Sequence, residues 1–138
     1  MFYEFRITTD ASTTEASPKR TVYKLTHGVI TKASIQFPNG SAGLLRCRVK
    51  LGGALLWPRN VLSYISGDGN TIPITEYAKV YYGHNRLEII TWNNSTRFSR
   101  EVIIRVMVLP EEVVNQTKIF SDIRKALILL LRRIGVRL

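Results

Sequence analysis

Apolar and polar residues alternate with a period of two through most of this sequence, and that alternation constrains its fold more than any other feature. In residues 29–37, for example, Ile35 and Phe37 share one face of an extended chain while Ser34 and Gln36 share the other. Such alternation predicts half-buried β-strands, because successive side chains of a strand point to opposite faces. The predicted strands cover residues 2–8, 21–26, 29–37, 45–51, 54–57, 71–74, 86–92 and 101–109.

Turn-forming residues separate these segments, as at Asn39-Gly40 and in the stretch 66–70, Ser-Gly-Asp-Gly-Asn. No helical pattern of useful length occurs before residue 110. About eight short strands at regular spacing predict an all-β fold: an antiparallel β-sandwich of jelly-roll type, with a small barrel as the alternative. The chain of 138 residues is then divided into a β-sandwich over residues 1–110 and a C-terminal helix over residues 111–138.

Several inward positions of these strands are expected to form the core. Ile35 and Val106 belong to uninterrupted alternating strands, and Trp57 lies in a short apolar run. Cys47 falls on the inward face of its strand, where a free cysteine is usually buried and inert. A lone cysteine also excludes an internal disulfide framework.

After Pro110 the apolar period changes to that of an α-helix. Glu111 and Glu112 suit a first helical turn, where carboxylates meet the positive end of the helix dipole, and Gly135 is a candidate C-cap. Residues 117–134 therefore predict a basic amphipathic helix. Its apolar positions are predicted to serve assembly: Ile119, Ile123, Leu127, Leu130, Leu131 and Ile134. Because residues 126–131 are apolar nearly all round, something must cover them: the sandwich, another copy, another protein or lipid.

The helix also carries much of the positive charge. The formal net charge is +10, and residues 117–138 contribute half of it, with six basic residues and one acidic residue. Such asymmetry indicates an anionic partner, which could be nucleic acid, phospholipid or an acidic protein surface; solvated arginines beside an apolar face are the alternative. The residues predicted to meet that partner are Arg124, Lys125, Arg132 and Arg133.

A second basic group occupies the outer face of the strand at residues 45–51. Arg46, Arg48 and Lys50 alternate with inward apolar residues, and they form either a solvated face or a docking surface. The strand end at Trp92, Asn93 and Asn94 is a possible ligand site, because a tryptophan at the rim of a sandwich can stack on a sugar.

Catalytic and metal-binding patterns are sparse. With two histidines and one cysteine, the sequence offers few metal ligands, and no nucleophile elbow or phosphate-binding loop is present. We expect no enzyme activity, no cofactor and no metal site. The sequence contains no stretch of 18 apolar residues, so no membrane-spanning helix is predicted. The first residues lack a signal-peptide pattern.

Five segments carry a resemblance to known proteins. They are residues 2–8, Phe37-Pro38-Asn39-Gly40, Leu56-Trp57-Pro58, Ser66-Gly67-Asp68-Gly69 and Leu87-Glu88-Ile89-Ile90-Thr91-Trp92-Asn93. Over residues 1–110 the chain resembles small β-sandwich virion proteins of phages, such as capsid decoration, minor capsid and tail accessory proteins. The resemblance implies a non-enzymatic subunit of a symmetric assembly and transfers no site residues.

Three hypotheses of function follow. The first is a structural protein located in a virion, which docks on a capsid or tail, forms homo-oligomers and contacts other virion proteins through its helix. The second is a module that binds glycans or another surface ligand. The third is a basic nucleic-acid-binding protein, whose phosphate contacts would make affinity fall steeply with salt. Membrane contact through the basic C-terminus is retained as an alternative to protein contact.

Overall fold

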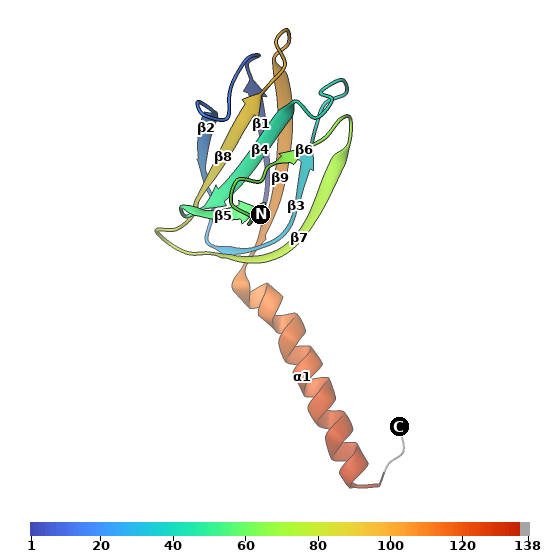
Figure 1. The fold of residues 1–138 in the computed structure, drawn as a ribbon. Helices are drawn as coiled ribbons and strands as arrows, with labels where there is room; N and C mark the ends of the chain where they lie inside the picture. Colours follow the sequence, from blue (N-terminus) through green and yellow to red (C-terminus); the bar gives the residue numbers. More distant parts are fainter. Residues whose placement is uncertain (136–138) are drawn as a thin grey trace.

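Two antiparallel sheets pack face to face, and a long helix extends from one end of them (Figure 1). The computed structural model describes residues 1–135, except for the side chains of residues 116–119. Its elements are β1 (Phe2–Thr9), β2 (Lys19–Lys24), β3 (Gly28–Gln36), β4 (Leu45–Leu51), β5 (Ala54–Trp57), β6 (Ile65–Ser66), β7 (Thr71–Val80), β8 (Arg86–Asn93), β9 (Arg100–Leu109) and α1 (Glu111–Arg133). The all-β sandwich followed by a C-terminal helix is confirmed.

The strand order is that of a jelly roll. One sheet has the order β1-β9-β3-β7, and the other has the order β2-β8-β4-β5, with the short strand β6 paired to β4. When β6 is set aside, the first strand pairs with the last, the second with the one before it, and so on inwards to β4 and β5. This nested pairing is what a long folded hairpin produces when it rolls up into two sheets.

The predicted strands differ from the structure mainly at β6 and β7. β6 has two residues and was not expected, whereas β7 has ten residues and continues beyond the predicted segment 71–74. Pro73 lies within β7 but does not interrupt it, because β7 is an edge strand that pairs only with β3. A proline cannot donate a backbone hydrogen bond, so an edge position tolerates it.

The core lies between the two sheets and consists of the inward residues that alternation predicts. Ile35 on β3 and Val106 on β9 are fully buried, and Trp57 is buried at the end of β5. Cys47 is also fully buried, and desolvation raises the pKa of its thiol to about 12. These core predictions are confirmed.

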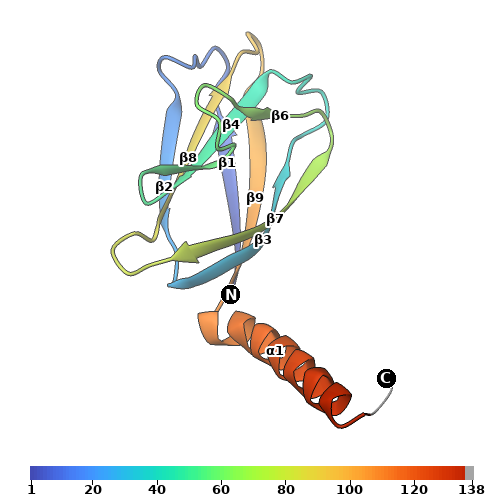
Figure 2. The ribbon, with the colours of Figure 1, turned by 60° about the horizontal axis from the view of Figure 1, so that its bottom comes forward.

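The helix follows β9 with only Pro110 between them and points away from the sandwich (Figure 2). Both views show the body of α1 separate from the sheets, with only its first turns close to them. The helix is therefore a projection of the sandwich, not a layer of it.

Candidate functional site

Helix α1 begins at Glu111, where the two carboxylates predicted a first helical turn. The apolar periodicity recognised over residues 117–134 lies within this longer helix except for its last residue. Glu111 and Glu112 occupy the first turn and Arg132 and Arg133 the last, so both ends carry the charge that the helix dipole favours. Gly135 follows the helix with a φ of 83°, and its N–H donates a hydrogen bond to the carbonyl oxygen of Arg132 at 3.1 Å. A left-handed glycine at this place is a common way to end a helix.

The apolar side of α1 is open to solvent along its length. Leu127 and Leu130, in the middle of the predicted assembly set, are 54% and 58% exposed. Ile123 and Ile134 are exposed as well, and Leu131 is half-buried. The side chain of Ile119 lies outside the described residues. Of the covers considered for this helix, the chain's own sandwich is therefore ruled out for the exposed side chains.

The polar side of α1 is the side that faces the sandwich. An open hollow between the helix and β3 is lined by Thr31 and Leu109 from the sandwich and, from the helix, by Val113, Val114, Ser121, Asp122 and Lys125. Apart from Val113 and Val114 at its start, the helix contributes polar residues to this hollow. The exposed leucines and isoleucines do not line it, so the sandwich leaves the apolar side unobstructed.

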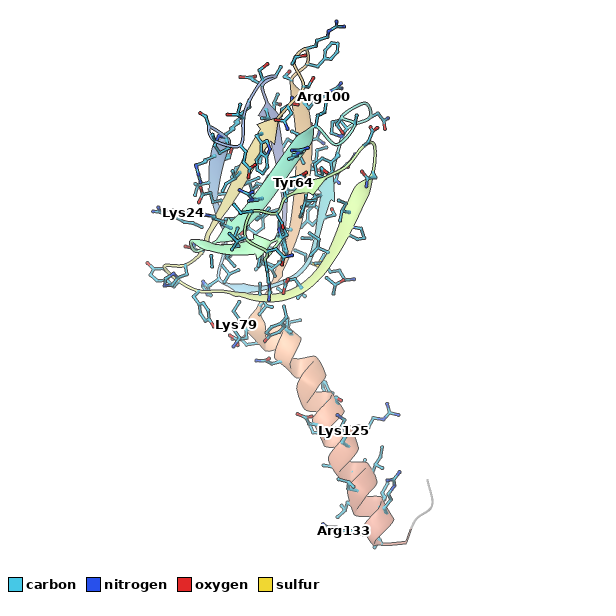
Figure 3. The ribbon with its side chains drawn as sticks, in the orientation of Figure 1. Lys24, Tyr64, Lys79, Arg100, Lys125 and Arg133 are labelled. Carbon is cyan, nitrogen blue, oxygen red and sulfur yellow. The ribbon has the colours of Figure 1, made fainter. Side chains whose placement is uncertain are left out.

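An ion pair joins the base of the helix to the sandwich. The Lys79 ammonium on β7 lies 3.0 Å from the Glu111 carboxylate, and Figure 3 labels Lys79 where the helix leaves the sandwich. The hydrogen bond to this carboxylate, and then its negative charge, raise the pKa of Lys79. The exposed rings of Tyr81 and Tyr82 lie beside the pair and line a cavity of about 450 Å³ together with His27 and Glu112. These contacts bring the start of α1 close to the end of β7.

The four basic residues predicted to meet an anionic partner all lie exposed on α1. They are Arg124, Lys125, Arg132 and Arg133, and among the described side chains none of them forms an ion pair. Figure 3 shows Lys125 projecting from the helix into solvent and labels Arg133 near its end. Their charge is therefore available to a partner of the helix.

The basic face of β4, in contrast, is not a solvated patch. The Arg48 side chain is 16% exposed; its Nε donates a hydrogen bond to the Ser63 carbonyl oxygen at 2.6 Å, and its Nη2 lies 2.6 Å from the Glu15 carboxylate. The guanidinium of Arg46 lies 4.3 Å from the centre of the Tyr64 ring. The segment between β5 and β6, which contains Ser63 and Tyr64, folds over this face and engages both arginines. Only Lys50, which is half-buried, has no such contact among the described residues.

Two of the three residues of the predicted ligand site at the end of β8 are buried. Trp92 is 1% exposed, because Tyr64 packs edge-on against its ring at 5.9 Å and the Arg48 guanidinium lies over it at 4.9 Å. Asn93 is fully buried, and its amide nitrogen donates hydrogen bonds to the carbonyl oxygens of Thr9 and Phe98. Asn94 alone is exposed. Trp92 therefore offers no face on which a sugar could stack.

The described residues contain no cluster of three or more histidine, cysteine or acidic side chains that could hold a metal ion. In the same part of the chain, no helix combines the length and the apolar character that a membrane span requires. No protein-family model matches this chain, and no curated protein matches it either. The geometry of α1 is consequently the main guide to function.

Proposed function

We propose that this chain is a non-enzymatic structural protein of a virion, in which the jelly-roll sandwich docks on a symmetric capsid or tail assembly. In this proposal α1 is the element through which the subunit joins the assembly. The observation that carries the proposal is the position of α1, which projects from the sandwich with its apolar side exposed.

The exposed apolar side of α1 is larger than a single soluble chain would ordinarily present. Phe120, Ile123, Leu127, Leu130 and Ile134 are all more than half exposed, and they follow one another along the helix. Contiguous apolar surface of this kind marks interaction sites, because its contact with water is unfavourable. A partner that covers the helix would remove this cost, and a subunit of a larger assembly has such a partner.

The jelly-roll body supports the same proposal by analogy of fold. Jelly rolls occur in viral capsid proteins, but also in lectins and other proteins, so the fold by itself does not select a function. The glycan-binding alternative depended on an exposed Trp92 and is weakened by the burial of that ring. The nucleic-acid alternative retains the basic residues of α1 but not Arg48, which is engaged within the sandwich.

The proposal is tested on particles from the native source of the protein. Immunogold electron microscopy and quantitative mass spectrometry should find the chain on purified virions at a fixed copy number. A variant that lacks residues 111–138 should remain soluble and folded but should no longer enter the particle. If the chain is absent from purified virions, or if the shortened chain enters them at full occupancy, the proposal fails.

A further inference from the structure

The apolar residues of α1 follow the spacing of a coiled coil. Starting at Val113, steps of three and four residues alternate without a break and reach the last residue before Gly135. The positions are Val113, Gln116, Phe120, Ile123, Leu127, Leu130 and Ile134. All but Gln116 are apolar, and the structure leaves all six of these apolar side chains exposed. Alternating steps of three and four are the heptad pattern in which helices pack knobs into holes against other helices.

These seven positions form the seam of α1, the stripe that would face other helices. Apolar residues beside the seam make it wider than that of a two-stranded coiled coil. Ile119 and Ala126 precede seam residues on one side, and Leu131 follows a seam residue on the other side. A narrow stripe of seam positions alone suits two helices, whereas apolar residues on the flanks suit a helix that packs against two neighbours. The apolar surface therefore fits a bundle of at least three helices.

The charges of α1 are compatible with identical neighbours in parallel orientation. In a parallel bundle, the residue before a seam position lies near the residue five positions later in the adjacent helix. These flanking pairs are Ile119 with Arg124, and Ala126 with Leu131, so neither brings two basic groups together. Lys125 and Arg132 lie on the opposite side of the helix, where they remain in solvent. None of the flanking pairs between residues 112 and 131 therefore joins two basic residues.

The polar seam residue also favours parallel helices. In a parallel bundle, position 116 of each copy lies at the same level as position 116 of the others, so the polar seam positions come together. In an antiparallel bundle, Gln116 would lie beside the leucines near the other end of the helix. A polar seam residue is a known means of fixing the register and orientation of helices.

We propose that α1 associates with α1 of other copies of this chain in a parallel bundle of three or more helices, with one sandwich at the first turn of each helix. The inference rests on the proposed role of α1 as the assembly element and names its partner. Ser121, Asp122 and Lys125, which line the hollow towards the sandwich, are not seam residues and stay outside the bundle, whereas the seam residue Val113 lines the hollow as well.

Two adjacent leucines provide a matched test. Leu130 is a seam residue and Leu129 is not, yet their side chains are 58% and 60% exposed in the single chain. The molar mass of the purified full-length chain, measured by size-exclusion chromatography with light scattering, should be at least three times 15.7 kDa. Leu130→Asp should reduce it to that of one chain, whereas Leu129→Asp should leave it unchanged. Circular dichroism of both variants checks that the sandwich remains folded.

Orientation requires a second measurement. A Val113→Cys variant should form disulfide-linked pairs under a mild oxidant, because parallel helices bring residue 113 of neighbouring copies together, and the buried Cys47 does not compete. A bundle without this cross-link would overturn the parallel arrangement.

A wild-type mass of one chain, or a single chain that floats with vesicles of phosphatidylcholine and phosphatidylglycerol, would overturn self-association itself. A mass of two chains would overturn the bundle of three or more helices, and an equal effect of the two leucine variants would overturn the assignment of the seam. Because all of these measurements use purified protein, they can fail while the chain is still found on virions.

Discussion

Replacement of Arg48 by alanine should destabilise the sandwich, because this arginine connects the outer face of β4 to Ser63, Glu15 and Trp92. Three interactions would be lost: the hydrogen bond to Ser63, the ion pair with Glu15, and the contact with the Trp92 ring. A hydrogen bond from a charged donor contributes about 1.5–3 kcal/mol. The pair with the half-exposed Glu15 adds about 0.2–1 kcal/mol, and the cation–π contact about 0.5–1 kcal/mol. We expect Arg48→Ala to lower the free energy of unfolding by about 2–5 kcal/mol.

Urea unfolding followed by tryptophan fluorescence measures this loss. Lys50→Ala is the matched control, since Lys50 lies on the same face of β4 without a side-chain partner among the described residues; its effect should stay within about 0.5 kcal/mol. Glu15→Gln should have an intermediate effect of at most about 1 kcal/mol. If Arg48→Ala lowers the free energy of unfolding no more than Lys50→Ala does, the contacts of Arg48 do not stabilise the sandwich, and Arg48 is free to serve as a docking residue.

Three further predictions concern the sandwich and its appendage. Deletion of residues 111–138 should leave a cooperatively folding sandwich whose Tm falls by about 4–8 °C, because the apolar contact of α1 with the sandwich is little more than that of Val113 and Val114 near Leu109. A shortened chain that is unfolded by circular dichroism would contradict this. Val106→Asp should abolish folding, because Val106 is fully buried and a carboxylate there would have no partner, so a soluble variant with a cooperative thermal transition would show that the inward face is wrong. The pKa of the Cys47 thiol is about 12 in the folded chain, against an ordinary value of 9.0, so unfolding should become easier as pH rises above about 9, since only the unfolded chain then loses the thiol proton. The free energy of unfolding of Cys47→Ala should fall less steeply over that range than that of the wild type. Equal slopes of the two proteins would refute the effect.

Alternation predicted the strands because each strand of this sandwich has one face in the core. Ile35, Cys47 and Val106 were placed correctly for that reason alone. The pattern did not predict β6, since a strand of two residues shows no alternation. It also ended the segment 71–74 before the end of β7 at Val80, although Pro73 fits the edge position that β7 occupies.

The outer face of a strand is where the sequence was misleading. Arg46, Arg48 and Trp92 alternate outwards from the core, and outward residues are expected to meet solvent. Here the segment before β6 crosses the sheet, and Tyr64 covers the space between Trp92 and Arg46. Alternation shows which way a side chain points but not whether a distant segment lies over it. The register that places Trp92 opposite Arg46 is known only from the structure, so the burial of this pair could not be predicted from the alternation.

For the helix, the sequence predicted an apolar surface that must be covered by the sandwich, another copy of the chain, another protein or lipid. The structure excludes the sandwich, because the polar side of α1 faces it. Most of the stability of helices in proteins comes from an apolar side that packs against another element. Within a single chain α1 lacks that packing. The partner that covers Phe120, Ile123, Leu127 and Leu130 would therefore stabilise the helix itself as well as the assembly, so folding of α1 and its association are expected to be thermodynamically coupled.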